Sequence, residues 1–224
     1  MEPEGYEPLS GRAVWARRAF IALIALDLLS IVSGYFEYSL YGQDVITQEE
    51  VDTNDIRQGL VALLDFAAFV LAVVMFIRWF KRAYENLPAL GVPKLRFGSG
   101  WTIGSWFVPF LNLFRPKQIA NDIWRGSDPA AEAEQGEDWY RRPVTPLLHW
   151  WWGFYLGSNY LDWVVVRTYW RDNDVSSLHS AAAAGMIADC ASIVGLILGL
   201  LVIRNVTMRL DERAARLAAA PAAV

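Results

Sequence analysis

The chain has 224 residues, of which 54% are hydrophobic and 11 are tryptophan, and its net charge is −4. The apolar residues come in long blocks, which excludes an ordinary soluble domain of this length and indicates a small polytopic membrane protein. The net charge says little about partners, because the distribution of positive residues among loops matters more here than their sum. The single cysteine, Cys190, excludes an internal disulfide and a paired-cysteine metal site, and its apolar neighbours predict a buried packing residue.

The first half of the chain predicts two spanning helices. Residues 1–18 form a cytoplasmic tail, and the apolar run 19–36 lacks a small-residue cleavage site, so we expect it to remain as the first span. Residues 37–58 hold six acids and one base without an apolar period, which predicts a solvated loop. The second span covers 59–80 and ends in the aromatic and cationic residues typical of a membrane surface.

The segment 97–124 is apolar but fits no ordinary span, because Pro109 and Asn112 interrupt it. Broken backbone at membrane depth is tolerated only where protein or a wet cavity covers it. We therefore expect a re-entrant or interfacial half-helix packed against spanning helices. The Asn112 amide is expected to satisfy carbonyls freed by Pro109, although it could instead bind a substrate, as broken transporter helices do.

Two further spans follow a polar linker. The third, 145–166, opens with Pro146, which is tolerated near a helix start. A second short polar loop leads to the fourth span, 181–203, whose helix continues into a cytoplasmic segment, 204–224. A single transmembrane domain therefore covers 19–203.

The count of Lys and Arg selects the topology. If the segment 97–124 turns back without crossing, 17 positive residues lie inside and 3 outside, whereas a crossing segment gives 10 on each side. The positive-inside bias favours the first arrangement. We therefore predict an all-α integral membrane protein with four transmembrane helices, one re-entrant or interfacial half-helix and both termini in the cytoplasm.

A resemblance to a known family rests on three stretches: WFKRAYENLPALG, GSGWTIGSWFVPFLNLFRPKQIANDIWRGSDP and HWWWGFYLGSNY. They resemble the bacterial membrane-protein family called domain of unknown function 4328. Its signature falls on Trp79, Arg82, Asn86, Gly100, Trp101, Gly104, Trp106, Phe107, Pro109, Asn112, Pro116 and Trp124. The resemblance implies that the half-helix is the family's signature element and that the protein lies in a bacterial inner membrane. It implies no activity.

Other features have both a structural and a functional interpretation. The tryptophans near the cytoplasmic boundaries, including Trp79 and the run 150–152, predict an interfacial anchoring belt. Gly195 and Gly199 indicate either helix dimerisation or close packing within the chain. A cytoplasmic pocket for anionic headgroups could be formed by Arg82, Asn86, Arg115 and Lys117, but ordinary stop-transfer charge explains the cations equally well.

Each full span carries one aspartate, and the four are Asp27, Asp65, Asp162 and Asp189. Ionisable residues inside a membrane are costly and tend to face the bundle interior or a wet cavity. At 1.5 Å per residue the topology places all four within roughly 8 Å of the midplane, on its outer side, so they could meet in one layer. Small or polar residues flank them at helical spacing: Ser30, Ser158, Asn159, Gly185 and Ser192.

Carboxylates in one layer must share protons, bind a cation or pair with Arg57 or Arg167, the nearest positive residues. The alternative is that hydrogen-bonded aspartates merely tie the bundle together, as interhelical polar contacts commonly do. A carrier or channel and a structural contact therefore both remain open.

No catalytic motif is present, so we expect no enzymatic activity, no cofactor and no metal site. Two functional classes remain: a binding, assembly or lipid-sensing module, and a small carrier or channel for protons or cations that uses the four aspartates. The expected partners are the lipid bilayer and either another membrane protein or a second copy of the chain, without nucleic acid.

Overall fold

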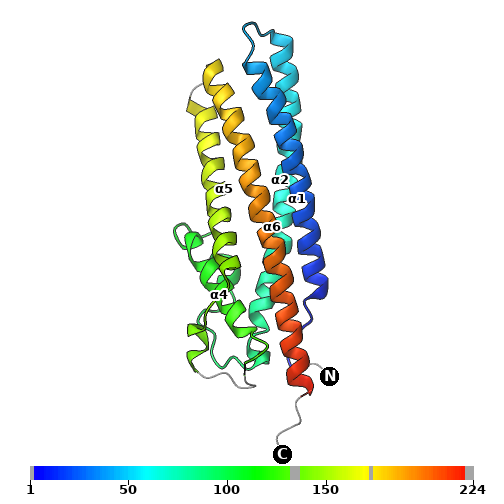
Figure 1. Ribbon diagram of the computed structural model, residues 1–224, viewed down its shortest axis with the longest axis vertical. Helices are drawn as coiled ribbons and strands as arrows, with labels where there is room; N and C mark the ends of the chain where they lie inside the picture. Colours follow the sequence, from blue (N-terminus) through cyan, green and yellow to red (C-terminus); the bar gives the residue numbers. More distant parts are fainter. Residues whose placement is uncertain (1–2, 132–136, 172–173, 220–224) are drawn as a thin grey trace, which may run out of the picture. The chain divides into compact units, whose positions relative to one another are not determined.

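The computed structural model describes residues 3–131, 137–171 and 174–219, and every regular element in them is helical. The long helices are α1 (Ser10–Tyr41), α2 (Gln48–Glu85), α5 (Pro146–Arg171) and α6 (Val175–Ala219), as Figure 1 shows. The shorter ones are η1 (Pro88–Leu90), α3 (Trp101–Gly104), η2 (Leu111–Leu113), α4 (Arg115–Gly126) and η3 (Glu137–Arg141). Among the described residues, α1, α2 and α6 are long and apolar enough to cross a membrane. The expected all-helical fold with membrane-crossing helices is confirmed at this level.

The chain divides into two compact units. The four-helix unit comprises Arg18–Ala72 and Trp150–Gly199, and the loop-bearing unit comprises Met1–Arg17, Val73–His149 and Leu200–Val224. Each long helix contributes residues to both.

Small residues let the helices of the four-helix unit approach closely. A Cβ atom at Gly199 on α6 would lie 2.7 Å from the ring of Phe20 on α1, so this glycine cannot be replaced without movement. A Cβ atom at Gly34 on α1 would lie 3.0 Å from Met186 on α6. Gly199 therefore serves packing within the chain, the second of the two interpretations of its spacing with Gly195.

The expectation that residues 37–58 form a solvated loop is wrong, because α1 continues to Tyr41 and α2 begins at Gln48. Thr47 and Glu50 start α2 as a capping box. The Glu50 carboxylate accepts hydrogen bonds from the Thr47 backbone N–H at 2.8 Å and from its hydroxyl at 2.7 Å, while the Glu50 N–H donates to that hydroxyl at 3.3 Å. The second polar loop is also shorter than expected, since α5 ends at Arg171 and α6 begins at Val175.

Two further expectations about single residues need correction. Cys190 is exposed and is not a buried packing residue. The tryptophan belt is only partial, because Trp79, Trp151 and Trp152 are buried packing residues, whereas Trp15 and Trp150 are exposed. Aromatic rings near a membrane boundary can anchor or fill a core, and burial separates the two roles.

Candidate functional site

The four predicted aspartates all lie in the four-helix unit and face one another. Asp27 on α1 is within electrostatic range of the other three, and Asp162 on α5 is within range of both Asp65 on α2 and Asp189 on α6. Their exposure is graded. Asp27 is only 4% exposed, Asp65 and Asp189 are half-buried, and Asp162 is exposed. The structure therefore brings together one carboxyl group from each long helix.

Asp27 and Asp65 form the innermost pair. Their side chains lie close enough to interact electrostatically. Yet Asp27 Oδ2 and Asp65 Oδ1 are buried and have no hydrogen-bond donor among the described residues. An ionised carboxylate only accepts hydrogen bonds, so a hydrogen bond between these two groups requires a proton on one of them.

Two serines lie near carboxyl groups of the facing helix. Ser192 on α6 lies near Asp27 on α1, and Ser30 on α1 lies near Asp189 on α6. This reciprocal arrangement uses two of the flanking residues that the helical spacing singled out. The flanking residues on α5 behave differently: Ser158 and Asn159 donate to the Tyr155 carbonyl of their own helix, at 3.2 and 2.6 Å.

The nearby arginines bind other groups. Arg57 donates to Ser33 Oγ at 3.1 Å and to Asn54 Oδ1 at 2.5 Å, and the Arg167 guanidinium lies 5.4 Å from the centre of the Trp163 ring. In the described part of the chain, no group of three or more His, Cys, Asp or Glu side chains is arranged to hold a metal ion. Among the described residues, neither Arg57 nor Arg167 forms an ion pair with one of the four aspartates.

A second polar cluster joins α1 to α2, and the sequence did not reveal it. Buried Glu37 accepts a hydrogen bond from Gln58 Nε2 at 2.5 Å, and Gln58 Oε1 accepts one from Ser33 Oγ at 2.7 Å. Ser33 and Glu37 continue the helical face that begins with Asp27 and Ser30. The helical spacing of these polar residues is the signal for the cluster, but it is visible only if the first helix is expected to continue past residue 36.

The signature residues lie in the loop-bearing unit, where several are packing residues. Trp79 on α2 is 1% exposed and donates from Nε1 to Thr207 Oγ1 at 3.0 Å. Trp106 packs edge-on against Phe76 and Phe80, with ring centres 5.6 and 5.8 Å apart. The tryptophans therefore attach the broken segment and α6 to the end of α2.

Arg82 and Asn86 do not belong to a headgroup pocket, because both bind the N-terminal segment. Arg82 forms an ion pair with Glu7 at 2.9 Å. Asn86, fully buried, donates to the Glu7 carbonyl at 2.8 Å and accepts from the Glu7 N–H at 3.1 Å. Arg82 and Asn86 are therefore engaged within the chain, and Arg115 and Lys117 are the remaining members of the pocket that the sequence left open.

The segment 97–124 contains three short helices, α3, η2 and α4, where a single half-helix was expected. Its sharpest bend is at Phe110, whose φ is 64° and whose neighbours close a γ-turn through a 2.8 Å hydrogen bond from Leu111 N–H to the Pro109 carbonyl. A non-glycine residue in such a turn is strained by on the order of 1 to 3 kcal/mol. Among the described residues the Asn112 side chain has no hydrogen-bond partner, so its amide does not repair this break.

The remaining signature residues surround the broken segment. Pro116 is buried in the first turn of α4, Trp101 and Phe107 are exposed, and Trp124 lies beneath the Arg209 guanidinium, 4.1 Å from its ring centre. Gly100 and Gly104 have negative φ values and room for a Cβ atom, and nothing in the structure explains why they are glycines.

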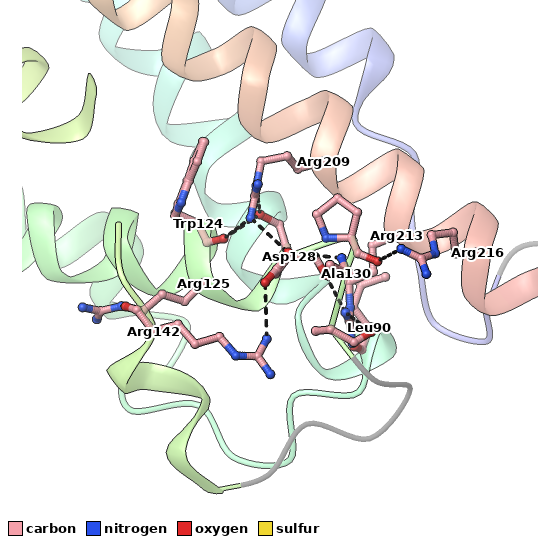
Figure 2. A network of polar contacts seen from close by, with 12 residues as sticks. Leu90, Trp124, Arg125, Asp128, Ala130, Arg142, Arg209, Arg213 and Arg216 are labelled. Carbon is pink, nitrogen blue, oxygen red and sulfur yellow. Dashed lines mark hydrogen bonds and ion pairs between the residues drawn. The ribbon is translucent and has the colours of Figure 1, made fainter. Parts of the chain in front are cut away.

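Arginines on α6 hold the chain that follows α4, as Figure 2 shows. Arg213 is buried and donates to the Leu90 carbonyl at 2.9 Å and to the Asp128 carbonyl at 2.6 Å. Arg209 donates to the Trp124 carbonyl at 3.2 Å. Backbone carbonyls that a short irregular segment leaves free thus receive donors from one face of a long helix.

An ion pair with a buried carboxylate fixes α4 to the preceding loop. Asp122 is 0% exposed, and its two carboxylate oxygens accept from Arg96 at 2.9 and 2.6 Å. Burial raises the pKa of the Asp122 carboxyl, and Arg96 opposes this rise. Phe97 continues the attachment, because its N–H donates to the buried Tyr84 hydroxyl at 3.0 Å and its carbonyl accepts from the same hydroxyl at 3.1 Å.

Comparison with known proteins gives one match. The family model described as Domain of unknown function (DUF4328) matches residues 43–208, well over half of the chain. No curated protein and no solved structure matches. The matched range contains three of the four aspartates and every residue of the expected signature. The chain therefore belongs to the family Domain of unknown function (DUF4328).

Proposed function

We propose that this protein binds and releases protons at Asp27 and Asp65, as a small non-enzymatic proton carrier or channel. The observation that carries the proposal is that two neighbouring carboxyl groups each bury an oxygen that has no hydrogen-bond donor in the described part of the chain. Two neighbouring carboxyl groups with buried oxygens cannot both be ionised at low cost, so they share one proton. The proton leaves one carboxyl oxygen for the other, or for water, without any change of redox state.

The graded exposure of the four aspartates supports a path for this proton. Asp162 is exposed and interacts electrostatically with Asp65, which in turn contacts buried Asp27. A chain of ionisable groups inside a membrane is typical of proton relays. A proton accepted by Asp162 would reach Asp27 through Asp65.

The finer topology is part of the same proposal. If α5 spans the membrane in addition to α1, α2 and α6, the four spans put both termini and the segment 97–124 on the cytoplasmic side of a bacterial inner membrane. α5 has 26 residues, and a spanning helix needs about 20. The count of 17 positive residues inside against 3 outside supports this orientation.

Cysteine labelling in intact cells tests the topology. Lys94→Cys and Ser176→Cys, each in a Cys190→Ser background because Cys190 is exposed, place one reporter on either proposed side. A membrane-impermeant reagent should label the Ser176 variant alone. Labelling of the Lys94 variant from outside would overturn the orientation.

Proton flux into liposomes tests the function. The full chain is reconstituted with a pH-sensitive dye inside, and a proton gradient is imposed. Asp27→Asn and Asp65→Asn should abolish the flux, whereas Asp44→Asn, in the exposed turn between α1 and α2, should leave it unchanged. The competing assembly module predicts lost stability in Asp27→Asn and no flux above empty liposomes in the wild type, and that result would refute the proposal.

A further inference from the structure

The connection between α3 and α4 exposes a group of apolar side chains, which we name the 107–114 turn. Five of its residues are exposed: Phe107, Val108, Phe110, Leu113 and Phe114. Phe110 is the most prominent, at 79% exposed. A cluster of this kind on one short segment differs from scattered surface hydrophobic residues, and it marks a surface that binds something apolar.

The backbone at Phe110 strengthens this interpretation. The residue occupies the strained γ-turn with φ of 64°, where glycine or asparagine would be less costly than an aromatic residue. No ring contact or cation contact within the described chain involves Phe110 and compensates for the strain. An unfavourable backbone conformation without a compensating contact inside the chain indicates that the residue binds something outside it.

Positive charge without an acidic counterpart lies directly beside the turn. The Arg115 guanidinium stacks 4.4 Å from the ring centre of Phe97, and among the described residues it has no ion-pair partner, while its Nε is buried without an acceptor. Residues 97–121 contain no Asp or Glu, and α4 has no acid in its first turn. This segment is therefore complementary to an anion.

Contacts within the loop-bearing unit place the turn beside the end of α2. Trp106 packs on Phe76 and Phe80, which lie near the end of the membrane-crossing helix α2. The turn begins at the next residue. In a bilayer leaflet the acyl chains are followed by the phosphates. Aromatic residues followed by a cation, as in the turn and Arg115, have the matching order.

We propose that the 107–114 turn and Arg115 form a binding surface for anionic phospholipids. Phe107, Phe110 and Phe114 insert among the acyl chains, and the Arg115 guanidinium donates to the lipid phosphate. Lys117, which is half-buried and donates to the Asn121 amide oxygen at 2.6 Å, adds positive charge at the same end of α4. All of these residues belong to the loop-bearing unit, so the inference is independent of the proton-binding proposal.

Lipid retention by the full chain in detergent tests the inference, with native mass spectrometry comparing phosphatidylglycerol and phosphatidylcholine. The wild type should prefer phosphatidylglycerol, and Arg115→Gln should bind it about tenfold more weakly, because a charge-assisted hydrogen bond is lost. Arg115→Lys should retain most of the preference as a point charge. Lys94→Gln, which removes an exposed cation from the same unit, is the matched control and should have no effect.

Phe110→Asn separates lipid binding from folding. The substitution relieves the strained φ, so thermal stability in lipid-free detergent should stay equal or rise, while phosphatidylglycerol affinity falls several-fold. The inference is overturned if Arg115→Gln behaves like Lys94→Gln, or if inorganic phosphate alone displaces the lipid. It is also overturned if Phe110→Asn changes the oligomeric state and leaves lipid retention intact, because the turn would then bind a second copy.

Discussion

Both units bury an aspartate, but they surround it differently. In the loop-bearing unit Asp122 is fully buried, and both of its oxygens accept hydrogen bonds from Arg96. In the four-helix unit Asp27 is 4% exposed, one of its oxygens has no partner among the described residues, and its charged neighbours are three more aspartates. A carboxylate with a complete set of partners holds a structure together, whereas an unsatisfied one needs a functional explanation. The first site is therefore structural, and the second is the site of the proposed proton binding.

Breaking the satisfied pair should have the largest effect on stability. Asp122→Ala removes a fully buried carboxylate and the two hydrogen bonds that it accepts from Arg96, and it should lower the free energy of unfolding by about 3 kcal/mol, since a hydrogen bond to a charged group contributes about 1.5 to 3 kcal/mol. Thermal unfolding followed by tryptophan fluorescence in detergent measures the change. Asp128→Asn is the control, because its ion pairs with Arg142 and Arg209 are longer, at 3.8 and 3.7 Å, and partly exposed. Equal losses for the two variants would remove the distinction between the sites.

Replacing a buried neutral side chain in the same unit should lower the free energy of unfolding by less. Asn86→Ala removes the two hydrogen bonds to the backbone of Glu7 and should cost about 1 to 3 kcal/mol. The variant should also release residues near the N-terminus, which limited proteolysis would detect. An unchanged cleavage pattern would show that Asn86 does not hold this segment.

Lys117 is a half-buried cation of the loop-bearing unit whose partner is an amide and not a carboxylate. Burial, with the nearby Arg125 charge, lowers its pKa from 10.5 to about 8. Between these values the unfolded chain binds more protons than the folded one, so stability rises with pH through this window. Lys117→Met should therefore flatten the rise and stabilise the protein at neutral pH by about 1 kcal/mol after allowance for solvent screening. An unchanged slope between pH 8 and 10.5 would contradict the assigned cause.

The convergence of the aspartates could be predicted because it depends on regular geometry. One acid per apolar segment and a fixed rise per residue were enough to predict that Asp27, Asp65, Asp162 and Asp189 lie near one another. The start of α2 was missed although the sequence contains its signal. Thr47 and Glu50 have the spacing of a capping box, but the dense acidic charge around them favoured a loop.

Other features could not be predicted, because they depend on long-range contacts or on backbone strain. Asn86 finds its partner Glu7 on a segment 79 residues away, and no local pattern indicates that contact. Trp151 and Trp152 occupy the boundary position typical of an anchor, yet the packing of the bundle buries them. Phe110 adopts a positive φ that aromatic residues avoid, so an aromatic residue at this position did not predict a turn.

The central claim is that Asp27 and Asp65 share a proton, and infrared spectroscopy of the reconstituted protein tests it most directly. At neutral pH the wild type should show the carbonyl stretch of a protonated carboxylic acid, and this band should disappear in Asp27→Asn and Asp65→Asn but persist in Asp44→Asn. Such a band arises only from a carboxyl group that carries its proton where an exposed aspartate would have lost it. A wild-type spectrum without the band, or with one that both Asn variants retain, would contradict the account.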